Sequence, residues 1–199
     1  GEPKRDIAVL AAGVLGWLAV RHGDDVSMIS GGPGRIHATR ARNSEAHLEH
    51  VLQETIALSQ PDSPPSDLPG LLRHVSRNVR GRKVLLIIAD DGVEPREVED
   101  LLRSLRLRHE VLWVDVADLD PLGVAEDTLV RDVAADHTLP ELLATDRLLA
   151  EEFGRSETTR RADVETMLRR TDVSSARAGH TDEVVPMIVR MLEKRRRGR

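Results

Sequence analysis

The feature that most constrains this chain is an unbroken apolar run that ends in two carboxylates and a glycine. Five large aliphatic residues follow Lys83, and Asp90 and Asp91 close the run. A run of this kind between charged flanks is typical of a strand buried on both faces, as in the centre of a parallel sheet. Ligands of open α/β sheets bind at the carboxyl ends of such strands. We therefore expect a central strand over 84–89, with the two aspartates where chemistry or metal binding usually occurs.

Helical and strand patterns alternate on both sides of this run. Pro3 and Gly23 frame a first helix of about twenty residues, and its apolar positions wrap almost all the way round, so we expect it to be covered on most sides. Residues 25–40 predict a hairpin that turns at four residues containing three glycines. The further expected helices lie at 48–56, 68–79, 98–105, 139–153, 157–170 and 181–192, and the further expected strands at 110–116, 129–133 and 172–177.

This alternation predicts an α/β fold whose sheet is mainly parallel, with helices on both faces and one antiparallel hairpin strand. The expected order places the hairpin at one edge, followed by the strands at 84–89, 110–116 and 172–177. The last helix begins at Thr181-Asp182-Glu183, which should cap it. The apolar residues of that helix are expected to point inward, and they are Val184, Val185, Ile188, Val189 and Leu192.

Composition narrows the function classes. The 199 residues suit one domain spanning 1–199, and the absence of cysteine excludes disulfides and thiolate metal sites. Acidic residues outnumber basic ones by 34 to 29, and only three residues are aromatic, which argues against a nucleic-acid binder. The longest uncharged apolar stretch, residues 7–20, is shorter than the roughly 20 residues of a membrane-spanning helix. The basic tail at 194–199 favours a stabilising cation cluster at a helix C-terminus.

Two further groups of residues resemble metal ligands. His47 and His50 share a helix face, but their spacing fits no zinc motif, so a solvated face is favoured. Asp115, Asp118 and Asp120 line the end of a strand and form a secondary cation candidate. No motif brings a nucleophile together with a base and an orienting group.

Three stretches carry a family resemblance. Residues 19–26 read Ala-Val-Arg-His-Gly-Asp-Asp-Val, residues 80–90 run from Arg-Gly-Arg into the apolar strand, and residues 168–192 contain the last strand and helix. Together, and in this order, they resemble the bacterial von Willebrand factor A-like proteins catalogued as domain of unknown function 58. The resemblance implies a von Willebrand A-type fold, a cytoplasmic location often tethered by upstream membrane helices, and association with AAA+ ATPases of the MoxR type.

The function expected from this resemblance is a non-catalytic interaction or scaffold domain that helps to assemble or mature other proteins with such an ATPase. We expect no enzyme activity, no cofactor, no nucleic-acid partner, and membrane contact only through segments outside the chain. The competing hypothesis is a Mg²⁺-dependent phosphoryl-transfer or hydrolytic enzyme that uses Asp90 and Asp91.

One departure from the family pattern concerns metal binding. A full von Willebrand A domain opens with a central strand ending in Asp-x-Ser-x-Ser, which supplies its main metal ligands, whereas this chain begins at the following helix. We therefore expect a fragment, or another segment in the position of that strand, which falls between the hairpin at 25–40 and the strand at 84–89 in the expected order. The resemblance places Ser66 and Asp90 at two remaining ligand positions of an incomplete site. Mg²⁺ suits such oxygen ligands in a complete member, but we expect this chain to bind it weakly or not at all.

Overall fold

The computed structural model of the chain describes residues 3–60, 65–90, 92–117, 131–132, 137–138 and 147–197. Its central element is a parallel sheet whose strands lie in the order β3-β4-β7. These strands are β3 (Val84–Asp90), β4 (Glu110–Val116) and β7 (Ser174–Ala178). The order and the parallel pairing of these three strands confirm the expectation from the sequence.

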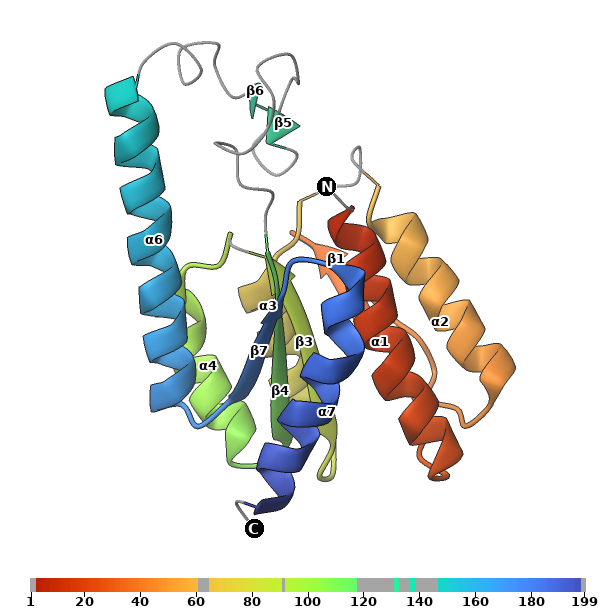
Figure 1. The fold of residues 1–199 in the computed structure, drawn as a ribbon. Helices are drawn as coiled ribbons and strands as arrows, with labels where there is room; N and C mark the ends of the chain where they lie inside the picture. Colours follow the sequence, from red (N-terminus) through yellow and green to blue (C-terminus); the bar gives the residue numbers. More distant parts are fainter. Residues whose placement is uncertain are drawn as a thin grey trace.

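Helices cover both faces of this sheet (Figure 1). One face packs against α1 (Lys4–Arg21) and α7 (Thr181–Arg197), and the other packs against α3 (Leu68–Asn78), α4 (Pro95–Arg106) and α6 (Arg147–Arg170). The α/β architecture is therefore confirmed. Among the described helices, none is both long and apolar enough to cross a membrane.

The expected hairpin is present but forms a sheet of its own. Its strands, β1 (Ile29–Gly32) and β2 (Arg35–Ala38), pair antiparallel around a turn in which Gly34 has φ 74°. A glycine suits this left-handed conformation because it has no Cβ. In the described part of the chain the hairpin does not pair with β3. Another antiparallel pair joins β5 (Arg131–Asp132) to β6 (His137–Thr138), and α2 (Glu45–Leu58) packs against α1.

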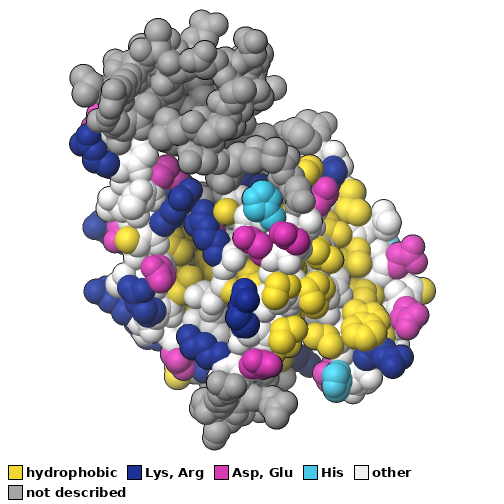
Figure 2. All heavy atoms as spheres, viewed as in Figure 1, with side chains coloured by type: hydrophobic (Ala, Val, Ile, Leu, Met, Phe, Trp, Pro, Cys, Tyr) yellow, Lys and Arg dark blue, Asp and Glu magenta, His cyan; other side chains and the backbone are white. Residues whose placement is uncertain are grey.

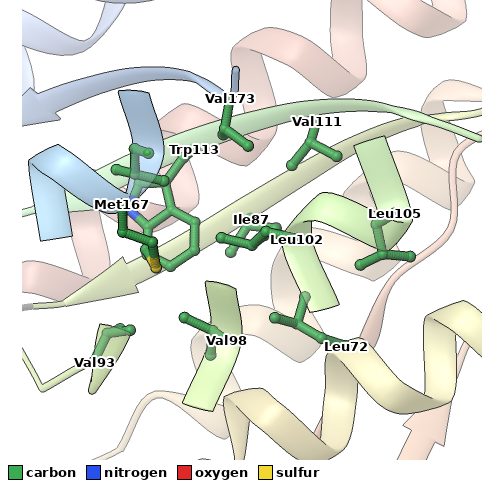
Figure 3. Close-up of a cluster of buried hydrophobic side chains, with 11 residues drawn as sticks. Leu72, Ile87, Val93, Val98, Leu102, Leu105, Val111, Trp113, Met167 and Val173 are labelled. Atoms are coloured by element: carbon green, nitrogen blue, oxygen red, sulfur yellow. The ribbon is translucent and has the colours of Figure 1, made fainter. Parts of the chain in front are cut away.

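Side chains of β4 alternate between two cores. Val111 and Trp113 point toward α3, α4 and α6, where Figure 3 shows the indole ring close to Met167. Leu112 and Val114 point to the opposite side, into the core shared with α1 and α7. This alternation follows from the two-residue period of a strand. β4 is the central strand because it pairs with β3 on one edge and with β7 on the other.

The expectation that residues 84–89 form the central strand is wrong. Among the described strands, β3 pairs only with β4, and its other edge has no partner. Val84 is 53% exposed, and of the β3 residues only Ile87 is buried. The physical reason is that an apolar run shows that helices cover both faces of a strand, whereas it carries no information about the pairing of the two edges.

Three expectations about helices also differ from the structure. The helices expected at 139–153 and 157–170 are replaced by one helix, α6, which continues through Gly154, and residues 139–146 lie outside the described chain. Glycine weakens a helix by about 1 kcal/mol relative to alanine but does not end it. In α7, Val185 and Val189 are 47% and 45% exposed, because Val184 and Ile188 already define the inward face.

The first helix is less covered than expected. Of its residues only Ile7, Ala11 and Gly16 are fully buried, and Trp17 is half exposed. Figure 2 shows hydrophobic side chains gathered on the face that α1 and α7 form together. The apolar composition of α1 therefore exceeds what the described neighbours bury.

Candidate functional site at the carboxyl edge of the sheet

Parallel strands bring their carboxyl ends to one edge of the sheet, and charged side chains gather there. Asp90 ends β3, Asp115 lies one residue before the end of β4, and Arg177 lies one residue before the end of β7. The turn after β7 then leads into α7. In open α/β sheets this edge is the usual position of a binding site.

Asp90 is exposed, and two neighbours hold its carboxylate. The Lys4 ammonium lies 3.5 Å from Oδ2, and the backbone N–H of Gly92 donates to Oδ1 at 3.1 Å. The first contact comes from the start of α1, and the second closes a tight turn directly after the strand. Asp91, which the enzyme hypothesis places beside Asp90, lies outside the described residues.

Ser66 lies two residues before the first residue of α3 and is exposed. The next residue, Asp67, is the N-cap, and its Oδ1 accepts a hydrogen bond from the N–H of Gly70 at 2.8 Å. In the described part of the chain, no hydrogen bond joins Ser66 to Asp90. The two residues that the resemblance assigns to an incomplete metal site are therefore not hydrogen-bonded to each other.

The best-defined charge pair at this edge joins neighbouring strands. Asp115 and Arg177 are register partners in the β4–β7 ladder, and Arg177 Nη1 donates to Asp115 Oδ2 at 2.8 Å. Asp115 is therefore engaged by a cation from its own fold. The other members of the secondary cation candidate, Asp118 and Asp120, lie outside the described residues.

Glu183 caps the start of α7 from within its first turn. Its Oε2 accepts hydrogen bonds from the N–H groups of Gly179, at 2.7 Å, and His180, at 3.3 Å. These two backbone donors, the first more than the second, lower the pKa of the exposed Glu183 carboxyl below its usual value. The expectation that residues 181–183 cap this helix is confirmed through the glutamate.

The histidines of α2 lie apart from this edge. His47 Nε2 lies 3.1 Å from the carbonyl oxygen of Val26, and His50 and His37 each approach Glu54 Oε1, at 3.4 and 3.5 Å. Across the residues that the structure describes, no group of three or more His, Asp or Glu side chains is arranged to hold a metal ion.

Comparison with known proteins assigns the chain to a family. The family described as Protein of unknown function DUF58 matches residues 1–163. The chain belongs to the DUF58 family. It is 29% identical over 202 residues to uncharacterized proteins of Mycobacterium bovis and of two strains of Mycobacterium tuberculosis. These alignments cover 98% of this chain and 62% of each relative, so the chain spans less than two thirds of their length. No solved structure matches it.

Some charged residues at the carboxyl edge could be identified from the sequence, and others were missed. Asp90 and Asp115 were identifiable because they follow or end apolar strands. Lys4 and Arg177 were missed, since each lies far along the chain from the carboxylate that it contacts. A signal for Arg177 was present, because two expected neighbouring strands carried opposite charges near their ends.

Proposed function

We propose that this DUF58 chain is a von Willebrand A-like interaction domain that works with an AAA+ ATPase of the MoxR type in the assembly or maturation of other proteins. The proposal rests on the family assignment. The fold type and the partner are suggested by the resemblance of residues 19–26 and 80–90 to the von Willebrand factor A-like proteins. A cytoplasmic location, with membrane attachment through segments outside this chain, belongs to the same proposal.

The observation that carries the interaction role is the charge pattern at the carboxyl edge. Lys4 with Asp90, and Arg177 with Asp115, present both signs of charge from α1 and from three adjacent strands. Charges fixed on rigid elements suit recognition of a complementary protein surface, because they set orientation and suppress wrong partners. Each carboxylate is already engaged by a cation, which favours a binding surface over a site that activates water or a phosphoryl group.

The proposal includes weak Mg²⁺ binding by this chain, or none. This ion requires near-octahedral oxygen coordination, whereas the Asp90 carboxylate is engaged by the Lys4 ammonium and by the N–H of Gly92. Titration calorimetry of Mg²⁺ and Mn²⁺ into wild type and Asp90→Ala should show weak binding or none. Micromolar affinity that disappears in Asp90→Ala would contradict this part of the proposal.

A binding experiment with purified proteins tests the partner. The chain is mixed with a purified MoxR-type ATPase from the same genome, and complex formation and the ATPase rate are measured. Arg177→Gln should weaken the complex by about tenfold, because a positioned charge is lost. The matched control is Arg103→Gln, which removes an exposed arginine that pairs with carboxylates within α4.

Two outcomes would overturn the proposal. One is the absence of a complex with a folded chain and an active ATPase. The other is Mg²⁺-dependent turnover of a phosphate ester that is lost in Asp90→Ala, which would establish the enzyme hypothesis instead.

A further inference from the structure

Three turns meet at the amino edge of the sheet, at the opposite end of the strands from the carboxyl-edge site. They connect α3 to β3, α4 to β4 and α6 to β7, and Figure 1 shows all three at the lower end of the molecule. Exposed basic residues gather on these turns and on the helix ends beside them. We define the basic rim as Arg77, Arg80, Arg82, Lys83, Arg108 and Arg170.

Two arginines join the middle turn to its neighbours. Arg108 Nη2 donates to the carbonyl oxygen of Ser76 at 2.8 Å and to its Oγ at 2.9 Å, which connects the turn to the end of α3. Arg106 donates to the carbonyl oxygen of Asp172 at 2.8 Å and to its Oδ2 at 2.9 Å, which connects the turn to the α6–β7 segment. These long-range hydrogen bonds fix the turns relative to one another.

Basic side chains outnumber carboxylates at this edge, where β4 begins at the buried Glu110. The residues of the three turns include one carboxylate, Asp172, and Arg106 already pairs with it. Within the described chain, no member of the basic rim pairs with a carboxylate. Burial is the main cause that lowers the pKa of His109, and the positive charges of Arg108 and Lys83 lower it further. The cations of this edge therefore also act on a buried side chain.

Stabilisation of helix C-termini does not account for the whole rim. Basic residues in a last turn favour the helix dipole, which explains Arg77 and Arg170. Arg80, Arg82 and Lys83 instead follow the end of α3 and lie in a loop in which Gly81 adopts φ 69°. This loop presents its cations to solvent without a local structural role.

Two aliphatic side chains are exposed among these cations. Leu107 is 85% exposed between Arg106 and Arg108, and Val84 follows Lys83 with half of its surface exposed. An apolar centre with a charged periphery is the usual anatomy of a protein interface. The rim thus offers a hydrophobic contact as well as charge.

We propose that the basic rim binds an acidic segment of a partner protein, with carboxylates on the arginines and an aliphatic side chain on Leu107. Guanidinium groups match carboxylates in bidentate geometry. The rim contains no aromatic residue, so it lacks both the stacking platform of a single-strand binder and the interfacial anchors of a membrane-surface site. This surface is separate from the carboxyl edge, and the inference does not depend on the proposed function.

Fluorescence anisotropy with a labelled glutamate-rich peptide that carries leucines at its centre tests the proposal. We expect binding that weakens as salt rises, because screening shortens the Debye length from about 8 Å at 0.15 M to about 3 Å at 1 M. The double variant Arg80→Gln/Arg82→Gln should lose about tenfold in affinity. The matched control, Arg35→Gln/Arg40→Gln, removes two exposed arginines from the hairpin region and should bind like wild type.

A second variant separates the apolar contribution. Leu107→Ser should weaken binding of the leucine-containing peptide but leave an all-glutamate peptide unaffected. Equal affinity of the rim variant and the hairpin control would overturn the proposal, as would failure of the folded wild-type chain to bind either peptide. Binding of phosphatidylserine vesicles or of DNA through the rim, in preference to the peptides, would also overturn it and assign the rim to that class of ligand.

Discussion

Two glycines of α1 face α2 but leave different amounts of space. A Cβ added at Gly16 would lie 2.4 Å from Cδ1 of Leu48, whereas a Cβ added at Gly13 would lie 3.6 Å from Cδ1 of Leu52. Carbon atoms in favourable contact are about 3.5–4.0 Å apart. Alanine should therefore fit at Gly13 and collide with the buried Leu48 at Gly16.

The expected energies have opposite signs. Alanine in a helix interior is favoured over glycine by about 0.5–1 kcal/mol, so Gly13→Ala should raise the free energy of unfolding by that amount. Overpacking a core costs about 1–3 kcal/mol, so Gly16→Ala should lower the free energy of unfolding by up to about 2 kcal/mol. The two variants should differ by about 1–3 kcal/mol, and each kcal/mol moves Tm by about 2–4 °C for a chain of this size.

Urea unfolding followed by circular dichroism measures both variants under the same conditions. Leu48→Ala, combined with Gly16→Ala in a double-mutant cycle, should show a favourable coupling of about 1–3 kcal/mol, because the truncated side chain removes the collision. The reasoning is refuted if Gly16→Ala is as stable as Gly13→Ala, since Leu48 would then move aside without cost.

Three further predictions concern charged groups. Arg177→Ala should lower the free energy of unfolding by about 0.2–1 kcal/mol in urea titrations, because its partner Asp115 and the guanidinium are both partly exposed; a larger loss would contradict this estimate. Because the pKa of Glu183 is lowered on folding, its stabilising effect is present at pH values above its usual pKa of 4.5 and is lost as pH falls through the folded pKa. Glu183→Gln should flatten the acid side of the plot of unfolding free energy against pH, and an unchanged plot would count against the capping role. Because the pKa of His109 is lowered from 6.5, the unfolded chain binds more protons in mild acid, and stability should fall as pH drops below about 6.5; His109→Gln should remove that slope, and a slope that persists would assign it to another group.

Much of the fold could be predicted from periodicity. The first helix, the hairpin and the order of the three parallel strands all follow from apolar spacing and turn residues. The position of β3 at the edge of the sheet could not be predicted, because apolar spacing indicates which faces of a strand are covered and not which of its edges are paired. The orientation of Val185 and Val189 was wrong because the buried face of α7 follows the helical spacing of Val184, Met187, Ile188 and Met191, and Val185 and Val189 lie outside it.

The candidate site was predictable only in part. A carboxylate after a strand can be located from sequence, and Asp90 and Asp115 lie where the pattern placed them. The cation that engages each carboxylate depends on which elements become neighbours, and this is a property of the tertiary fold. The basic rim was missed for the same reason, because its residues come from several separate segments.

One edge of β3 has no partner among the strands that the structure describes, and this has a consequence for how the isolated chain behaves in concentrated solution. Its backbone N–H and C=O groups on that side form a template for another strand, and the five aliphatic residues from Val84 to Ile88 contain neither charge nor proline. Short segments with this composition are prone to cross-β stacking when they are exposed. A charged residue introduced into this strand would reduce such aggregation, but it would also disfavour the pairing of any further strand with this edge. Solubility and extension of the sheet therefore place opposite requirements on the same residues.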